Sequence, residues 1–332
     1  MRSIMEPVST QEFAASGGGT LPQAEAVRDG IRTLPMPLPA VAPPYTLGYL
    51  IVDSADDVHV LDPGWDDDAN WVRLEQGLAT IGKRPADVAS ITVSHLHSDH
   101  LGMADRLRSA SGARVALARR EQEAIDALAG RDVADHTGRL DEWGVPASAQ
   151  AELAQLKRPA LAPFRADTLL EDGDDLGIPG RALTALHTPG HTPGHLSFVD
   201  SGDRLLFTGD HLLPNMFPGV GLGGPTESSP IGDYLDALER LAPYDEYEVC
   251  PGHGYRFTGL RARREQTAEH HLRRSREVAA LLAGSEDLSV WQIASGVHWT
   301  AGWPNLHGFE LQSALAQTAM HIEFVRSGRV AR

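Results

Sequence analysis

Short apolar runs alternate along the first half of the chain with longer stretches of helical spacing. Tyr45 to Val52 is an alternating run that becomes apolar, which predicts a strand, and Asp57 to Leu61 predicts its hairpin partner. Ala69 to Ile81 carries apolar residues at spacings of three and four, which predicts a helix with one buried face, and Gly82 ends it. Further strands are predicted over 90–93 and 114–118, and a short helix over 101–107. Strands that alternate with helices indicate an α/β fold.

The chain before residue 45 shows few signals of regular structure. Residues 1–20 contain a Gly17–Gly19 run and lack the apolar core of a signal peptide, so we expect them to be disordered. Pro35 to Pro44 is expected to be a proline-rich lead into the first strand. No stretch approaches the roughly 20 apolar residues of a membrane span, and Cys250, the only cysteine, permits no intrachain disulfide. We therefore expect a cytoplasmic protein that spans no membrane.

The segment from His95 to His100, with the sequence HLHSDH, places three imidazoles and a carboxylate directly after the predicted strand 90–93. These groups are the ligands that Zn²⁺ prefers, and packing alone does not require them at such density. Because residues i and i+2 of an extended segment point the same way, His95 and His97 can bind one ion together. Asp99 and His100 are then left to reach a second ion.

Three later segments carry the same residue types, each after a short apolar or β-branched run. They are TPGHTPGH at 188–195, FTGDH at 207–211 and PGHG at 251–254. Each polar residue is therefore expected on a loop at the end of a strand, where catalytic groups tend to be placed. The prolines of the first segment stiffen its loop, and its glycines allow the backbone to approach a metal closely.

With these four motifs the chain resembles the metallo-β-lactamase superfamily over roughly residues 40–260. An earlier LDPG at 61–64 is similar to that family's first motif, with Pro63 where Thr or Ser is more usual. The resemblance implies an α/β fold of four layers, an αβ/βα sandwich. In this fold two mixed sheets meet and the metal lies at one edge of their interface.

Carried over position by position, the family pattern implies seven metal ligands: His95, His97 and His191 on one ion, Asp99, His100 and His253 on the second, and Asp210 bridging both. Asp62 is implied to orient a ligand through a hydrogen bond. His195 and His187 are interpreted as structural residues of the same turn as His191. Two further residues are candidate substrate contacts: His211 could face the substrate, and Tyr255 could donate a hydrogen bond to a developing oxyanion. For each of them, a packed or solvent-exposed position without a role in the reaction is the alternative.

Residues 101–190 leave a wide gap between two ligand motifs. Arg119 to Leu128 and Ser148 to Leu156 are rich in helix formers, so we expect a helical insert over about 119–165 within a metallo-β-lactamase domain of residues 21–260. The apolar residues of the insert are Ile125, Leu128, Val133, Leu140, Trp143 and Val145. They either line a substrate pocket as a lid or only pack on the sandwich, and the sequence favours neither.

Helical spacing replaces strand patterns after Gly254. Helices are predicted over 267–282 and over 311–322, and a capping box of Ser289 and Gln292 begins a further helix between them. A turn and a short strand are expected from Ser327. Residues 261–332 therefore look like the winged-helix-like C-terminal domain of one branch of the superfamily, which includes glyoxalase-II-like hydrolases and β-lactamase-like nucleases.

Composition agrees with a globular enzyme. The chain has 332 residues, 42% of them hydrophobic, which suffices for a substantial core. The formal net charge of −16, from 45 acidic and 29 basic residues, opposes broad contact with nucleic acid.

The activity that the resemblance implies is hydrolysis of a small ester, thioester or lactone by a hydroxide that bridges two metal ions. Two Zn²⁺ suit the ligands best, and Fe or Mn also occurs in the family. Asp210 would hold the ions apart, and Asp99 would orient the nucleophile or carry a proton.

Two other activities stay open. A phosphodiesterase or ribonuclease would use the basic stretch from Arg261 to Arg276 to hold phosphates. An iron-dependent oxidoreductase is disfavoured, because the second-site ligands are complete and His97 is unsubstituted. The expected partner is a small-molecule substrate, and the insert and tail offer surfaces for a homodimer.

Overall fold

The computed structural model describes residues 5–39, 43–129, 137–156, 163–224, 226–285 and 287–329. One sheet has the strand order β2 (Ala26–Arg28), β3 (Ile31–Pro37), β4 (Tyr45–Val52), β5 (Val58–Leu61), β6 (Val88–Thr92), β7 (Arg114–Ala118) and β8 (Thr168–Leu170). The other has the order β1 (Glu6–Pro7), β13 (Phe257–Thr258), β12 (Glu248–Pro251), β11 (Leu205–Gly209), β10 (Leu196–Asp200) and β9 (Leu183–His187). Both sheets mix parallel and antiparallel pairs.

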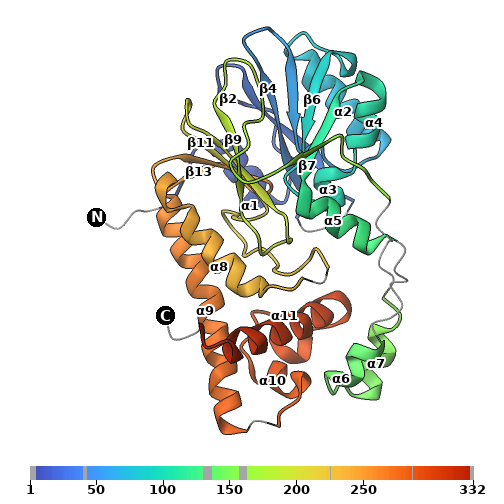
Figure 1. Ribbon diagram of the computed structural model, residues 1–332, viewed down its shortest axis with the longest axis vertical. Coiled ribbons are helices and arrows are strands. Elements are labelled where there is room, and N and C mark those ends of the chain that lie inside the picture. The colour runs from blue at the N-terminus through green and yellow to red at the C-terminus, as the bar shows by residue number, and fades with distance from the viewer. Residues whose placement is uncertain are drawn as a thin grey trace.

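Helices cover the outer face of each sheet (Figure 1). A buried apolar cluster that includes Tyr49 and Phe207 joins the two sheets, and the rings of these two residues meet edge to face with centroids 4.9 Å apart. The first sheet packs its outer face on α2 (Asp68–Ala79), α4 (Ala104–Ser111) and α5 (Arg119–Leu128). The second packs on α8 (Pro230–Arg240) and α9 (Leu260–Gly284). These layers confirm the predicted four-layer sandwich.

Most predicted elements of the sandwich are confirmed. Strands β3, β8 and β10 and helix α8 were not predicted, and β3 differs from an explicit expectation. The sequence suggested a proline-rich lead there, but Pro35 pairs with Leu47 and Pro37 with Tyr45 in a regular antiparallel ladder. Strand β2 pairs with β3 only through Ile31 and Arg32. The prolines therefore lie where the outer side of β3 has no strand partner, and a missing N–H costs little at such an edge.

The prediction of disorder for residues 1–20 is wrong for residues 6–18, which form β1 and helix α1 (Thr10–Gly18). The Ser9 hydroxyl caps the helix by accepting from the Glu12 N–H at 3.0 Å. The buried Glu12 carboxylate accepts from both the backbone N–H and the Nε–H of Arg256 at 2.9 Å. This charged pair joins α1 to the strand β13 region, and its partners lie too far apart in the sequence for local patterns to reveal it. Residues 1–4 lie outside the described part of the chain.

The helical insert packs on the C-terminal helices. Helices α6 (Thr137–Glu142) and α7 (Ala147–Leu153) lie beside α10 (Val290–Gly296) and α11 (Gly308–Arg326) in the lower half of Figure 1. Leu140 and Val145 are buried in one apolar cluster with these helices. Ile125 is buried under the first sheet instead, and Val133 lies outside the described residues. Ile125 therefore has the packing on the sandwich that was one alternative, while Leu140 and Val145 pack on the C-terminal helices, which neither alternative included. The role of the insert as a lid stays a prediction.

The C-terminal helices follow the prediction. The Ser289 hydroxyl accepts from the Gln292 N–H at 3.2 Å, and the Gln292 side chain accepts from the Ser289 N–H at 2.8 Å, which confirms the capping box. Ser327 ends α11, and the short strand expected after it would involve Val330, which lies outside the described residues. The winged-helix likeness therefore stays a prediction. No described helix is both long and apolar enough to span a membrane.

The packing of the insert predicts the effect of truncating Leu140, which is 3% exposed. We expect Leu140→Ala to lower the free energy of unfolding by about 2–4 kcal/mol, because the cavity opens inside a shared core. Glu142→Ala, at an exposed position of the same helix, should change it by less than about 0.5 kcal/mol. Urea unfolding followed by tryptophan fluorescence measures this, because Trp143, Trp291, Trp299 and Trp303 all lie in this cluster. Equal effects of the two substitutions would contradict the packing.

Candidate metal centre

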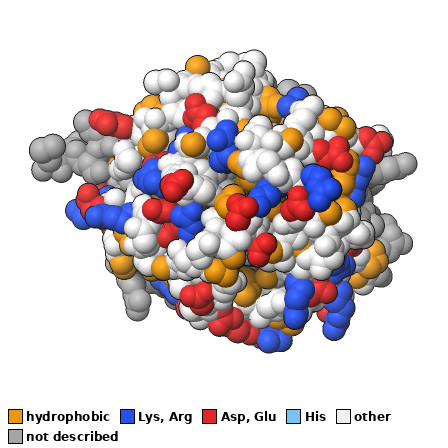
Figure 2. All heavy atoms as spheres, turned by 90° about the horizontal axis from the view of Figure 1, so that it is seen from above, with side chains coloured by type: hydrophobic (Ala, Val, Ile, Leu, Met, Phe, Trp, Pro, Cys, Tyr) orange, Lys and Arg blue, Asp and Glu red, His pale blue; other side chains and the backbone are white. Residues whose placement is uncertain are grey.

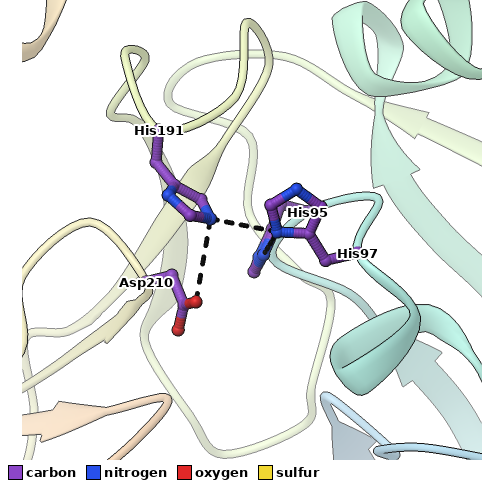
Figure 3. Close-up of side chains that lie close together, drawn as sticks. All are labelled: His95, His97, His191 and Asp210. Carbon is purple, nitrogen blue, oxygen red and sulfur yellow. Dashed lines mark hydrogen bonds and ion pairs between the residues drawn. The ribbon is translucent and has the colours of Figure 1, made fainter. Parts of the chain in front are cut away.

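Seven side chains gather at one edge of the two sheets in two groups that share Asp210. In the first group, the Nδ1 atom of His97 lies 3.0 Å from Nε2 of His95 and 3.1 Å from Nε2 of His191 (Figure 3). One carboxylate oxygen of Asp210 lies 3.7 Å from His191 Nε2. The four potential ligand atoms of this group all lie within 4.8 Å of one another.

The second group contains Asp99, His100 and His253 with the other oxygen of Asp210. Nε2 of His253 lies 3.2 Å from a carboxylate oxygen of Asp99 and 3.2 Å from Oδ1 of Asp210. Nε2 of His100 lies 3.3 Å from the same Oδ1 atom. The structure therefore brings together all seven residues predicted as ligands, in the two sets expected, with Asp210 common to both.

The ends of four strands place these groups. His95 and His97 follow β6, His191 lies between β9 and β10, Asp210 follows β11 and His253 follows β12. Close backbone packing is needed here. A Cβ on Gly252 would lie 2.7 Å from both Asp210 Oδ1 and His100 Cε1, and a Cβ on Gly190, where φ is 126°, would lie 2.6 Å from the Tyr234 Cα atom. Only glycine fits such positions.

Hydrogen bonds on the far side of the rings fix which nitrogen faces the cluster. Nδ1 of His100 lies 3.0 Å from Asp62, whose carboxylate also accepts from the Ser94 N–H at 2.7 Å. Nδ1 of His191 donates to the Gly219 carbonyl and Nδ1 of His253 to the Tyr45 carbonyl, each at 2.7 Å. A ring that donates from Nδ1 presents the lone pair of Nε2 to the cluster, which is how metal-binding histidines are usually oriented. Asp62 thus has the orienting position that the resemblance implied.

The two groups have different electrostatic character. Burial lowers the pKa of His95, His97 and His191, the last to about 4, so these imidazoles are neutral and offer lone pairs. Burial also acts to lower the pKa of His253, but the Asp210 and Asp99 carboxylates outweigh it and raise that pKa to about 10. The imidazoles of the second group are therefore protonated beside two carboxylates. Nε2 of His100 and Oδ1 of Asp210 are buried and form an ion pair, but neither atom makes a hydrogen bond with another described residue. Neutral imidazoles beside carboxylates that attract cations fit divalent metal ions.

The histidines predicted to be structural contact the ligand loops as expected. Nε2 of His195 accepts from the Asp210 N–H at 3.1 Å, and Nε2 of His187 donates to the Pro193 carbonyl at 3.0 Å. His211 and Tyr255 are not part of either group. His211 is fully buried beside Tyr234, with ring centroids 4.8 Å apart, and Tyr255 is 5% exposed and packs against Phe13. Both have the packed position that was the alternative to substrate contact.

Glu121, in the first turn of α5, was not among the predicted site residues. Its carboxylate is fully buried and accepts from the Leu96 N–H at 2.7 Å and the Gly194 N–H at 2.6 Å. Burial raises the pKa of Glu121 to about 7, although these bonds and the Thr192 hydroxyl act to lower it. A glutamate among helix formers in one sequence gives no signal of such a position.

Comparisons with known proteins agree with this geometry. Residues 42–253 match the family model described as metallo-beta-lactamase superfamily. A hydroxyacylglutathione hydrolase of Pseudomonas putida (strain GB-1) is 31% identical over 74% of this chain and 76% of its own length. An atrochrysone carboxyl ACP thioesterase of Aspergillus chevalieri is 29% identical over 42% of the chain and 44% of its own length. The chain spans less than half of some curated relatives and 91% of another.

A solved structure matches nearly the whole chain. The crystal structure of a metallo-beta-lactamase family protein from Thermus thermophilus has a TM-score of 0.73 and 28% identity, covering 91% of this chain and 95% of that one. The chain belongs to the metallo-β-lactamase superfamily. It is a metal-dependent hydrolase of that superfamily, with histidine and aspartate clusters for divalent metal.

The raised pKa of Glu121 predicts a pH dependence of stability in the metal-free protein. Because its folded pKa, about 7, exceeds its ordinary value of 4.5, the group's contribution to stability is largest below pH 4.5 and falls as the pH rises through 7. The difference in free energy of unfolding between wild type and Glu121→Gln should therefore decrease by up to about 3 kcal/mol over this interval. Urea unfolding at a series of pH values measures it. A difference that is constant or increases with pH would contradict the buried charge.

Proposed function

We propose that the protein is a binuclear metal-dependent hydrolase that acts on a small ester, thioester or lactone. The observation that carries the proposal is the pair of ligand groups joined by the two oxygens of Asp210. His95, His97 and His191 would hold one ion, and Asp99, His100 and His253 the other. This ligand set suits zinc best, and bound divalent ions would supply Lewis acidity and activate water for attack near neutral pH.

The chain's own residues supply the remaining functions. Asp210 is buried between both groups and would fix the separation of the ions. The side chain of Asp99 is 22% exposed, against 11% for Asp210 and 2% for His253. Asp99 is therefore the ligand carboxylate best placed to meet substrate, where it would orient the attacking water and accept its proton. Burial lowers the pKa of His95 and His191, so these rings would serve as neutral ligands and not as the proton acceptor.

Support for the substrate class comes from the relatives and from charge. One relative is named a hydroxyacylglutathione hydrolase and another an ACP thioesterase, and both names describe cleavage of an acyl group from a carrier. The net charge of −16 disfavours a polyanionic substrate. Acidic and basic side chains are interspersed over the face seen in Figure 2, without a broad basic area. A thioester or a similar small acyl compound is therefore our leading substrate class.

The phosphodiesterase alternative loses its main argument. Within the basic stretch 261–276, Arg261 and Arg264 each donate to Asp245 at 2.8 Å, and Arg263 donates to the Leu213 carbonyl at 2.6 Å. Arg274 and Arg276 donate to Gln317 and Glu269. Arg261, Arg263, Arg264 and Arg274 thus fix α9 to its neighbours, while Arg273 and Arg276 are exposed. Most of this basic stretch therefore has a structural role, so its presence in the sequence does not favour phosphate binding.

We expect Asp210→Ala and His97→Ala each to abolish hydrolysis and to leave the fold largely intact, because each removes a ligand from a preassembled site. Circular dichroism and initial rates on a thioester panel measure the two effects. His307→Ala, at an exposed histidine far along the chain, is the control and should keep wild-type turnover. More than about a tenth of wild-type turnover in a variant that has lost its metal would contradict the proposal.

Metal removal should abolish activity reversibly. Dialysis against a chelator is expected to give inactive protein, and Zn²⁺ or Mn²⁺ should restore hydrolysis, because the ligand groups are held by the fold and not by the ions alone. The readout is the rate on thioesters, lactones and bis-phosphodiesters before and after metal return. Activity that is indifferent to the chelator would refute a metal-dependent reaction, and hydrolysis confined to the phosphodiesters would refute the substrate class.

A further inference from the structure

Glu121 connects two loops that carry ligands of the same metal group. Its Oε2 atom accepts from the N–H of Leu96, which lies between His95 and His97. Its Oε1 atom accepts from the N–H of Gly194, which lies in the loop of His191. One carboxylate thus holds both segments from which the three imidazoles of the first group come, without contacting any of the rings itself.

The position is costly for a carboxylate. Glu121 is 0% exposed, and its carboxylate accepts hydrogen bonds from two backbone N–H groups among the described residues, neither of them cationic. The nearby Thr192 hydroxyl acts to lower its pKa, and no cationic side chain does so. An unpaired buried charge is unfavourable unless it is well hydrogen-bonded, and an apolar residue would fill the same space more cheaply. Packing alone therefore does not account for a glutamate here. Two short charge-assisted bonds to backbone donors do, because they fix the loops.

The backbone is shaped to meet this carboxylate. A Cβ on Gly194 would lie 2.4 Å from the Glu121 nitrogen and 2.8 Å from the Arg120 carbonyl carbon. The loop of His191 therefore presses directly on the first turn of α5, which only glycine at 194 permits. This close approach brings the Gly194 N–H within reach of the carboxylate.

The second group is held by other contacts. The Tyr45 carbonyl accepts from His253 Nδ1, the Tyr45 hydroxyl donates to the Gly254 carbonyl at 2.7 Å, and Asp62 contacts His100. Glu121 takes part in none of these bonds. Its loss should consequently disturb the first group and spare most of the second.

We propose that Glu121 is a positioning residue that sets the relative placement of the loops bearing His95, His97 and His191, and thereby the affinity of the first metal site. This inference rests on the proposed binuclear centre. Residues that orient metal ligands without touching the metal typically change metal affinity by 10–100-fold when replaced.

The test is a titration of metal-free protein with Co²⁺ in competition with a chelator, with visible absorption as the readout. Glu121→Gln keeps the size of the side chain but turns an amide NH₂ toward one of the two N–H donors. We expect it to weaken binding of one of the two ions by at least about ten-fold and to change its absorption band. The other ion should bind within about two-fold of wild type, and excess Co²⁺ should restore much of the lost turnover, which a merely misfolded variant would not show.

Asp200 provides the matched control. It is 1% exposed and its Oδ1 atom accepts from the N–H groups of Gly202 and Asp203, each at 3.0 Å, in the turn between β10 and β11. Asp200→Asn therefore also alters a buried carboxylate that holds two backbone donors, but in a turn that carries no ligand. Both ions should bind this variant as they bind wild type.

The outcomes separate the inference from the proposed function. If wild type binds two ions and hydrolyses substrate, and Glu121→Gln binds both ions as tightly, the role of Glu121 is refuted and the function stands. Equal weakening of both ions, or weakening in Asp200→Asn as well, would also refute it. Wild type that binds no Co²⁺ would overturn both proposals. If Glu121→Gln does not fold, Glu121→Asp, which keeps the charge but is one methylene shorter, must show the same selective loss.

Discussion

Five imidazoles and two carboxylates are crowded into a small, mostly buried volume at the edge of the sandwich. Placing so many lone pairs and charges together out of water is unfavourable unless a cation balances them. Without one, protons on the second group serve, which is why the Asp210 and Asp99 carboxylates raise the pKa of His253 to about 10 against the opposing effect of burial. Divalent ions fit the same place, and the neutral imidazoles of the first group offer lone pairs to a cation.

The scaffold supports this centre through contacts distant in sequence. Asp62 and Tyr45 fix rings of the second group, while Glu121 joins the loops of the first. The N-terminal segment contributes as well: the Val8 N–H donates to the Arg256 carbonyl at 2.9 Å, three residues beyond His253, and Glu12 binds the guanidinium of that arginine. The C-terminal helices and the insert share a separate apolar core. Figure 1 shows these helices in its lower half, below the sandwich. The fold thus consists of a sandwich that carries the candidate metal centre at its edge and a helical region with its own apolar core.

Sequence alone predicted the elements and residues whose signals are local. The β4 run, the β7 run and α5 were predicted with the observed bounds, and the HLHSDH, TPGH, GD and PGH segments gave all seven members of the two groups. Most of what it missed depends on contacts that a local pattern does not show. β3 forms a strand by pairing with β4, and its prolines are tolerated where its other side has no strand partner, while α1 is anchored by the distant contact between Glu12 and Arg256. Glu121 escaped notice for the same reason, since its two N–H partners lie in other loops. The insert was placed correctly as helical, but its packing partner, the C-terminal helices, could not be deduced from its own apolar pattern.

Anomalous X-ray scattering from crystals of protein purified without added metal tests the central claim most directly. Two peaks that share Asp210 are expected, one among His95, His97 and His191 and the other among Asp99, His100 and His253, with an absorption edge that identifies the element. A single peak, peaks away from these residues, or none after metal is supplied would contradict the account.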